Sequence, residues 1–455
     1  MEGVAVESSA APGARRRHGR PPFSERNRIV PDALTYHLRR LGSRLHRARI
    51  TLHGKGLHGF LRRALQGASP GPVAPAGPRP ATAPRQPAPG GKRILLVDTT
   101  TPRPDRDSGS LRAFNLMRLL LEEGHAVDFL PDDRADAGRY TDDLRELGVT
   151  VHCGPDAGGH LAWFRRHLPG FDALIVSRYH LGEFLIPLAR TVAPRVRVVL
   201  DTVDLHFLRE QREAELRGDR TLARLARATR ARELRAISEA DVAWVVSGAE
   251  RELLRGLLPA ARVLVLPNIH AIAGEVPPRE GRSGLLFVGG AGHPPNVDAI
   301  NWMLDEILPR VREVLPGCVF HVAGDGTRGV VGDRACPHVV AHGHVPDLAP
   351  LLASCRAGVA PLRFGAGVKG KVNQYMAHGL PAVVTTCAAE GMHLRDGEDA
   401  LVADDAESFA AAVARLLTDD ALWDRLSANG IANVRRHFSF DAARATLAAT
   451  FAGDT

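Results

Sequence analysis

The sequence predicts an α/β protein of two doubly wound, parallel-sheet domains that face each other across a cleft, preceded by a basic N-terminal extension. The chain of 455 residues is long enough for two such domains, each with its own core. From Lys92 onward, short β-branched runs alternate with helical stretches, the pattern of parallel sheets built from βαβ units. A Pro- and Gly-containing segment near Glu275–Gly284 interrupts this alternation and separates two series of strands.

The extension, residues 1–66, holds most of the positive charge. Residues 1–91 contain sixteen Lys and Arg against four Asp and Glu, a net charge of +12, which leaves −4 for the rest of a chain whose total is +8. A mildly acidic body lacks the basic face that binding to a phosphate backbone needs. We therefore expect no nucleic-acid partner.

Part of the extension has the spacing of a helix. Six apolar residues recur at alternating steps of four and three, with arginines between them: Leu34, Leu38, Leu41, Leu45, Ala48 and Leu52. This spacing predicts a basic amphipathic helix. Two interpretations are open: residues 31–65 attach to an anionic membrane surface, or they form a short self-associating helix or a partly disordered arm. The Pro-, Ala- and Gly-rich residues 67–91 predict an extended linker behind it.

The sequence also indicates where the protein resides. No run has the uninterrupted apolar residues that a membrane span needs, and Arg15–Arg17 are followed by Pro and polar residues instead of the apolar segment of a signal peptide. The five cysteines are widely spaced, with no CxxC pair, which is typical of reduced thiols. We expect a cytoplasmic protein, peripheral on the inner face of the cell membrane if the amphipathic helix binds lipid.

The two domains are predicted from their strands. The first spans residues 92–270, with strands at 93–98, 126–130, 149–152, 173–177, 196–201, 242–247 and 262–267. Residues 271–284 connect it to the second domain, 285–438, with strands at 285–289, 318–323, 338–343, 357–361, 382–386 and 400–403. A terminal helix is predicted in 439–455. Ligands of parallel sheets bind beyond the carboxyl ends of the strands, so we expect the site between the domains.

The lysines are the most informative residues. The chain has only four among its 59 basic residues, and Lys369 and Lys371 are separated by one glycine. They follow a Gly-rich turn, and a helix is predicted from about Lys371 to His378. Gly365 and Gly367 allow close approach of the backbone, while the helix N-terminus supplies amides and the ammonium groups supply charge. Cations at a helix start are destabilising without an anion, so the pattern favours a phosphate site over a solvated helix start.

Two other strand-to-helix junctions are expected to face the cleft. Gly109 and Ser110 lie at the N-terminus of a helix predicted to begin near Leu111, where amides can hold an anion, although an N-cap serine is also what any such turn needs. His293 and Asn296 stand at the second junction. Asn296 either contacts a phosphate or sugar or caps the helix that follows.

A polar cluster follows another buried strand of the first domain. Its members are Asp201, Asp204, His206 and Arg209, more charged groups than a turn requires. Ser247 and Glu250, in contrast, have the spacing of a capping box, for which we prefer a structural interpretation.

At this point the residues match a known pattern. The second domain, from Leu285 to about Phe438, resembles the glycosyl transferases group 1 proteins, relatives of bacterial mannosyltransferases and glycogen synthases. The resemblance rests on the FVGG…PPN segment, VAGDG (322–326), HGHVPDL (342–348) and above all PLRFGAGVKGKV followed by AHGLPAVVTT. The whole of 92–455 is compatible with it. The terminal helix looks like the segment that in this family crosses back to brace the first domain.

The resemblance implies the GT-B fold of two Rossmann-like domains, with a nucleotide-sugar donor held mainly by the second. Lys369 or Lys371 would neutralise the departing diphosphate, and no protein nucleophile would be required, because the departing nucleotide can take the acceptor's proton. Gly109 and Ser110 would close over the diphosphate, and His206 matches a family histidine near the sugar and acceptor. The other implied donor-binding residues are Gly290, His293, Asn296, Gly324, Gly365, Gly367 and Gln374.

The sequence departs from the family pattern at two positions. Many members carry two glutamates around the lysine motif, where this chain has Ala366 and Gln374. The second glutamate usually binds the ribose hydroxyls. Gln374 can still donate and accept hydrogen bonds, but it lacks the charge that strengthens them. The substitution therefore bears on donor affinity or identity.

Together these features predict a retaining hexosyltransferase that moves a sugar from a nucleotide-diphosphate sugar to a glycan or lipid-linked acceptor, in bacterial surface polysaccharide synthesis. No metal or other cofactor is expected, since no carboxylate pair or His/Cys set lies beside the Gly-rich turn. The alternative is a catalytically silent GT-B protein that binds nucleotide sugar or glycan as a scaffold. A metal-dependent GT-A transferase is disfavoured, because Asp132–Asp133 lie in an ordinary loop and the second domain would be unexplained.

Overall fold

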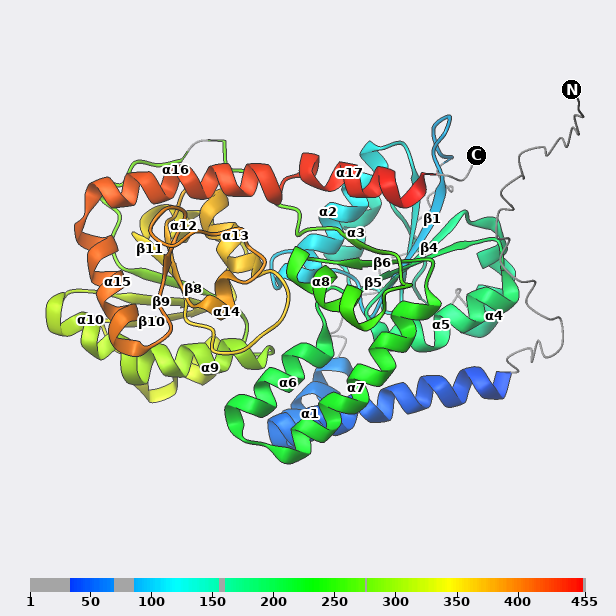
Figure 1. Ribbon diagram of the computed structural model, residues 1–455, viewed down its shortest axis with the longest axis horizontal. Coiled ribbons are helices and arrows are strands. Elements are labelled where there is room, and N and C mark those ends of the chain that lie inside the picture. Colours follow the sequence, from blue (N-terminus) through cyan, green and yellow to red (C-terminus); the bar gives the residue numbers. More distant parts are fainter. Residues whose placement is uncertain (1–32, 69–85, 155–159, 275, 453–455) are drawn as a thin grey trace, which may run out of the picture.

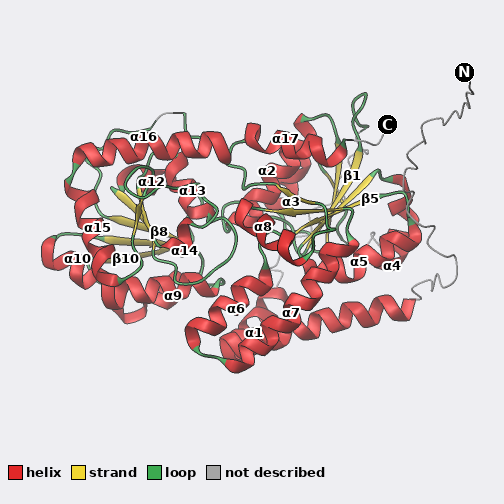
Figure 2. Cartoon of the chain, viewed as in Figure 1, coloured by secondary structure: helices red, strands yellow, loops and turns green. Residues whose placement is uncertain are grey.

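The protein is built from two α/β bodies that lie beside each other (Figure 1). The computed structural model describes residues 33–68, 86–154, 160–274 and 276–452, with side chains of the first helix described for residues 33–53. Each body has a central sheet with helices on both faces (Figure 2), which confirms the predicted fold class. None of the helices in these ranges is long and apolar enough to cross a membrane.

Both sheets are parallel throughout. The first has the order β3-β2-β1-β4-β5-β6-β7 and the second the order β10-β9-β8-β11-β12-β13. The strands are β1 (Arg93–Asp98), β2 (Ala126–Pro131), β3 (Thr150–Val151), β4 (Ala173–Ser177), β5 (Arg197–Asp201), β6 (Val242–Val245), β7 (Val263–Val265), β8 (Leu285–Val288), β9 (Phe320–Ala323), β10 (Val339–Gly343), β11 (Ala357–Ala360), β12 (Ala382–Val384) and β13 (Leu401–Val402). The order reverses between β1 and β4 and between β8 and β11, and ligands of such sheets bind at these reversals.

Every predicted strand is present, with ends that differ by up to two residues. The helices of the first body are α1 (Ala33–Ala68), α2 (Ser108–Glu122), α3 (Arg139–Leu147), α4 (His160–His167), α5 (Tyr179–Val192), α6 (His206–Arg217), α7 (Arg220–Glu239) and α8 (Gly248–Leu257). Those that follow are α9 (Pro294–Trp302), α10 (Leu308–Val314), α11 (Thr327–Val331), α12 (Ala349–Ser354), α13 (Gly370–Ala377), α14 (Thr386–Ala389), α15 (Ala406–Thr418), α16 (Asp420–His437) and α17 (Phe440–Phe451). A π-helical turn over Met303–Ile307 joins α9 to α10.

The strands are nearly continuous apolar runs because helices cover both faces of each sheet. All residues of β4 and β6 are buried, and β1 is buried from Ile94 to its end. The first sheet therefore separates two apolar layers, and the second body has one continuous core of its own. These rigid sheets fix the loops at the carboxyl ends of the strands, where the two bodies meet.

Helix α1 packs against α5 and α7 of the first body (Figure 1), a contact that the sequence did not predict. The buried face carries Tyr36, Ser43 and His46. The Ser43 hydroxyl donates to the carbonyl oxygen of His180 at 3.0 Å, and the His46 ring lies 2.9 Å from the Thr229 hydroxyl. These polar partners select this face, and the leucines of the predicted stripe remain 43% to 64% exposed. The predicted linker lies mostly outside the described residues.

Helix α17 lies against the first sheet, as the resemblance predicted for the terminal segment. The Trp244 indole nitrogen on β6 donates to the Thr450 hydroxyl at 2.9 Å, and Thr446 donates to the carbonyl oxygen of Val265 on β7 at 2.7 Å. Ala443, Leu447 and Phe451 join the apolar layer beneath. Figure 1 shows α16 along the second body continuing into α17 over the first. This helix pair thus connects the two bodies on the side away from α1.

Candidate active site

The two bodies meet where the Gly-rich turn and the start of α13 approach the first sheet. A Cβ at Gly370 would lie 2.4 Å from the Cβ of Ser108, the first residue of α2. Gly367 has φ of +68°, and a Cβ there would lie 3.1 Å from the Cβ of Asp204. Only glycine permits both approaches without displacing the neighbour. The N-termini of α2 and α13 therefore converge, and both direct the positive end of a helix dipole at the same place.

The two lysines at this place point in different directions. The Lys371 ammonium donates to Oδ1 of Asn296 at 2.6 Å and lies 3.9 Å from the ring centroid of Phe287. The Lys369 ammonium turns back on its own loop and donates to the carbonyl oxygens of Gly367, at 2.5 Å, and Ala366, at 3.3 Å. Lys371 thus contacts the β8–α9 junction, whereas Lys369 supports the Gly-rich turn.

Neither ammonium is within ion-pair distance of a carboxylate in the described part of the chain. Burial lowers the pKa of Lys371 well below its usual range, and the neighbouring Lys369 lowers it further. Burial also lowers the pKa of Lys369, against which Cys387, Glu390 and Glu250 act. Two buried ammonium groups without a paired carboxylate gain free energy when an anion binds near them.

The β8–α9 junction holds Asn296 against Lys371. Helix α9 begins at Pro294, with His293 as the residue before it, so the interpretation of Asn296 as the helix cap is wrong. Asn296 sits in the first turn, and its amide nitrogen donates to the carbonyl oxygen of Gly290 at 2.9 Å. Its oxygen is left to accept from Lys371. Asn296 therefore joins the loop after β8 to residues 365–371, the Gly-rich turn with its two lysines, which we call the lysine turn.

The loop after β1 is arranged somewhat differently from the prediction. Helix α2 begins at Ser108, three residues earlier than expected, and its cap is Asp107. The Asp107 carboxylate accepts from the amide and the hydroxyl of Ser110, at 2.8 and 2.7 Å. Gly109 and Ser110 lie in the first turn as predicted, but Ser110 is not the cap. The Ser110 amide is therefore already occupied by the cap.

The remaining predicted donor residues lie on the second body. Gly324 has φ of +145°, and a Cβ there would lie 2.5 Å from the backbone of Gly289, so the loops after β8 and β9 touch. The carbonyl oxygen of Gly365 accepts from Arg212 at 2.8 Å. Gln374 is half-buried in α13, one turn after Lys371, and its side chain makes no hydrogen bond within the described chain. Its amide is therefore available to a ligand.

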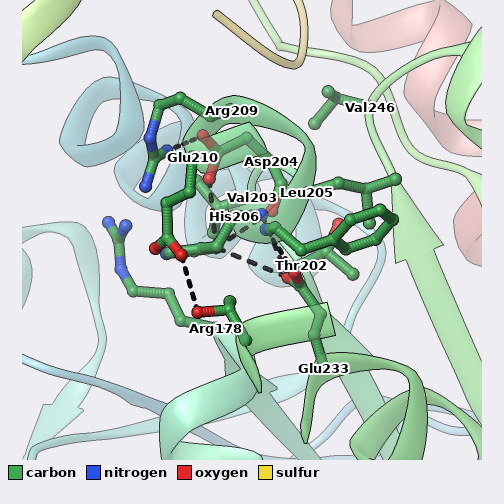
Figure 3. Close-up of polar contacts among 12 residues, drawn as sticks. Arg178, Thr202, Val203, Asp204, Leu205, His206, Arg209, Glu210, Glu233 and Val246 are labelled. Carbon is green, nitrogen blue, oxygen red and sulfur yellow. Dashed lines mark hydrogen bonds and ion pairs between the residues drawn. The ribbon is translucent and has the colours of Figure 1, made fainter. Parts of the chain in front are cut away.

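His206 begins α6 at the end of a strained segment. Val203 has φ of +66°, a conformation that β-branched residues rarely adopt. The backbone amides that follow are held by buried carboxylates: Leu205 donates to Glu250 at 3.3 Å, and His206 donates to Glu233 at 3.2 Å. Figure 3 shows the Glu233 carboxylate reaching the first turn of α6. Strain of this kind persists only where the surroundings fix it, and it concentrates at functional sites.

The charged residues near His206 are already paired. Arg209 forms an ion pair with Asp204 (Figure 3), and Asp204 also lies 3.3 Å from Nδ1 of His206. Asp201, predicted to lie in the same cluster, turns away and pairs with Arg112 in the interior of the first body. The structure therefore brings three of the four predicted residues together and assigns Asp201 to the core.

Several residues of the cleft gave no signal in the sequence. Arg178, after β4, donates to Asp98 at 3.1 Å and lies beside Gly109. Arg212 on α6 reaches across to Glu390 of the second body with two bonds, at 2.5 and 2.8 Å. Arg106 reaches Asp325 at 2.6 Å on the other side of the cleft. These contacts join segments far apart in the chain, so no local spacing marks them.

Two family models match the chain in its two halves. The model for the glycosyl transferase 4-like domain matches residues 110–269, and the model for glycosyl transferases group 1 matches residues 282–419. The two matches meet at the connection between the two sheets. No curated protein matches the chain in a search by sequence.

The fold is similar to that of several solved glycosyltransferases. Sucrose-phosphate synthase from Thermosynechococcus elongatus is 15% identical, with a TM-score of 0.60 over 79% of this chain and 98% of the other. A TarM variant of S. aureus in complex with UDP is 9% identical, with a TM-score of 0.63 over 80% and 100%. HepE of Anabaena in complex with UDP-glucose is 13% identical, with a TM-score of 0.60 over 79% and 99%. At these identities the likeness establishes the fold.

Proposed function

Because the chain belongs to the glycosyl transferases group 1 family and has the GT-B fold, we propose that it transfers a sugar from a nucleotide-diphosphate sugar to a glycan or glycolipid acceptor, with retention of configuration. The observation that carries this proposal is the pair of ammonium groups, Lys369 and Lys371, at the convergence of two helix N-termini. A diphosphate is the anion that such a site fits.

Lys371 is the residue proposed to contact the diphosphate. Its buried ammonium is held by Asn296 at the start of α13, and an anion bound there would interact with this charge and with the backbone amides of the helix start. Lys369 would hold the Gly-rich turn in shape through its hydrogen bonds to the turn's own carbonyl oxygens. As the sugar leaves, negative charge grows on the diphosphate oxygens, and preorganised cations stabilise this charge without a protein nucleophile.

The first body would supply the acceptor side. His206 lies at the start of α6, opposite the Gly-rich turn, and is largely buried, with 11% of the side chain accessible. Asp204 beside it is paired with Arg209, and Glu233 accepts from two backbone amides, so both carboxylates already have partners, which suits a neutral hydroxyl nucleophile. In this proposal the departing phosphate takes the acceptor's proton, and His206 orients the acceptor and sugar.

The family resemblance and the bound nucleotides named for the TarM and HepE structures support uridine diphosphate sugars as the first donors to test. We propose a role in bacterial surface polysaccharide or glycolipid synthesis, in the cytoplasm. No metal or cofactor is assigned to the reaction. The direct experiment incubates the protein with nucleotide sugars and records donor turnover and the anomeric configuration of the product by NMR. Turnover by the wild type, and its loss in Lys371→Met, would support the proposal.

Exposed leucines on α1 support membrane attachment through residues 31–65. Leu34, Leu38, Leu41 and Leu45 are more than half exposed, with Arg44 between them. The exposed side of the neighbouring α7 adds a row of arginines: Arg220, Arg224, Arg227, Arg230 and Arg235. An apolar stripe beside concentrated positive charge suits a surface of anionic lipid.

Vesicle binding tests this attachment. Replacing Leu38, Leu41 and Leu45 by serine should abolish binding to phosphatidylglycerol vesicles, and Leu253→Ser, a change of a leucine that is 36% exposed on α8, should not. Equal binding of both variants would contradict membrane attachment and favour self-association of the helix.

The two departures from the family pattern support one alternative, a protein that binds its ligand without catalysing transfer. With Ala366 and Gln374 in place of the family glutamates, a protein that binds nucleotide sugar or glycan without turnover would act as a scaffold. Binding of donor by calorimetry, with no turnover of any donor in the presence of a broad acceptor mixture, would support this second function.

A further inference from the structure

Glu250 lies between the two functional loops of the first body. It is the third residue of α8 and is 3% exposed. The predicted capping box is half correct: the Ser247 hydroxyl accepts from the Glu250 amide at 3.2 Å, but the carboxylate does not return to Ser247. Instead, Oε1 accepts from the amide of Leu205 at 3.3 Å and Oε2 accepts from the amide of Val246 at 3.1 Å.

Both amides belong to segments of the cleft. Leu205 is the residue before His206 and ends the strained segment that contains Val203. Val246 packs against the Gly-rich turn, since a Cβ at Gly367 would lie 3.2 Å from its side chain. One carboxylate therefore ties the segment that carries His206 to the surface on which the lysine turn rests.

Charged groups of both bodies surround this carboxylate. Lys369 faces it from the second body, Arg212 from α6 and Glu233 from α7. Burial raises the pKa of Glu250 to about 7, while the two amides and Lys369 favour the ionised form. Because Lys369 belongs to the other body, ionisation is favoured most when the two bodies are closed on each other. A charged acceptor also holds the two amides more strongly than a neutral one.

We propose that Glu250 is a positioning residue for sugar transfer: its ionised carboxylate holds the His206 segment in register with the lysine turn of the second body. This inference rests on the proposed function, because its readout is transfer. The sign of the pH dependence follows. Protonation weakens both hydrogen bonds, so transfer falls as the pH drops through about 7, while donor binding to the second body changes little.

The test compares Glu250→Gln with Glu252→Gln. A glutamine has a single acceptor oxygen and presents its NH₂ group to one of the two amides, so one hydrogen bond is lost. We expect kcat to fall at least about tenfold, because a displaced His206 segment misaligns the acceptor. The donor KM should stay near the wild-type value, and the decline near pH 7 should disappear. Glu252 lies on the same helix and, within the described part of the chain, forms ion pairs with Arg251 and Arg255 at the surface, so its variant should match the wild type.

The results separate this inference from the proposed function. If Lys371→Met transfers sugar like the wild type, the proposed site is wrong. If Lys371 is required but Glu250→Gln matches Glu252→Gln in kcat and pH profile, Glu250 has no positioning role. Should Glu250→Gln fail to fold, Glu250→Asp keeps the charge on a shorter side chain. We expect Glu250→Asp to lower kcat and to move the pH at which transfer declines. An unchanged pH profile would overturn the inference.

Discussion

The charged side chains of the lysine turn in the second body and of the His206 segment in the first body have different kinds of partner. In the lysine turn, two ammonium groups lie together, and their hydrogen bonds go to neutral oxygens of Asn296, Gly367 and Ala366. In the His206 segment, Arg209 is paired with Asp204, and two buried carboxylates hold backbone amides. In the described chain, no carboxylate lies within ion-pair distance of either ammonium of the lysine turn, whereas in the His206 segment one guanidinium pairs with a carboxylate and two further carboxylates accept from backbone amides.

This difference supports the proposal that the diphosphate binds at the lysine turn and the acceptor at the His206 segment. Buried cations without a counter-charge lower the stability of the folded protein, and such groups are found where they bind a ligand. The lysine turn thus suits a doubly charged diphosphate. A rigid segment whose charged groups already have partners suits an acceptor hydroxyl, which needs orientation more than charge. The comparison predicts that substitutions in the lysine turn reduce transfer without lowering stability, whereas substitutions in the His206 segment lower stability.

The largest effect is expected for Lys371→Met. Loss of the ammonium should lower kcat/KM by about 100-fold or more, corresponding to ~3 kcal/mol of transition-state stabilisation. Without ligand the melting temperature should not fall, because an ammonium whose pKa is lowered by burial disfavours the folded state at neutral pH. Lys369→Met should lose less, since its ammonium is bound by its own turn. Steady-state kinetics and thermal unfolding check both, and wild-type kinetics in both variants would remove the phosphate site.

The opposite outcome is expected for Asp204→Asn on the other side. Arg209 loses its counter-charge in a partly buried place, so the free energy of unfolding should fall by about 2 kcal/mol. Binding of nucleoside diphosphate should remain close to the wild type. Asp142→Asn is the matched control, because Asp142 pairs with Arg145 at the surface of α3 and should cost at most about 1 kcal/mol. Equal unfolding curves for the two variants would show that the His206 segment is not tightly held.

The sequence was a better guide to the lysine turn than to the His206 segment for a physical reason. Gly365, Gly367, Lys369 and Lys371 lie within seven residues, so local spacing reports the turn, the helix start and the charge together. The same holds for the strands, whose buried runs are local.

The His206 segment depends on partners far away in the chain. Glu233 on α7 and Glu250 on α8 hold its amides, and Arg212 binds Glu390 of the second body. The packed face of α1 was also missed, because Tyr36, Ser43 and His46 are selected by hydrogen-bonding and ring partners on α5 and α7 and not by their own hydrophobicity.

A smaller effect is expected for Gln374→Glu. If Gln374 faces the ribose from α13, a carboxylate there accepts from both hydroxyls and should strengthen donor or nucleoside-diphosphate binding by about 1 kcal/mol. Calorimetry on the wild type, Gln374→Glu and Gln374→Ala measures this. Equal affinities in all three would place Gln374 outside the ribose site.

No effect is expected from a chelator. Within the described ranges, no group of three or more His, Cys, Asp or Glu side chains is arranged to hold a metal ion. The charge on the diphosphate is assigned to Lys369 and Lys371, so transfer in EDTA should equal transfer in buffer. Loss of activity in EDTA that Mg²⁺ or Mn²⁺ restores would move the stabilising charge from the lysines to a metal.

The central claim, that the two lysines of the turn bind the diphosphate, is tested most directly by NMR of ¹³C-lysine-labelled protein. The chain has only four lysines, so the Cε signals can be assigned by substitution of Lys55, Lys92, Lys369 and Lys371 in turn. On titration with UDP, GDP, ADP or dTDP, the account predicts that the signals of Lys369 and Lys371 shift with one of these nucleotides while those of Lys55 and Lys92 stay in place. If none of the nucleotides moves either signal of the turn, the claim is contradicted.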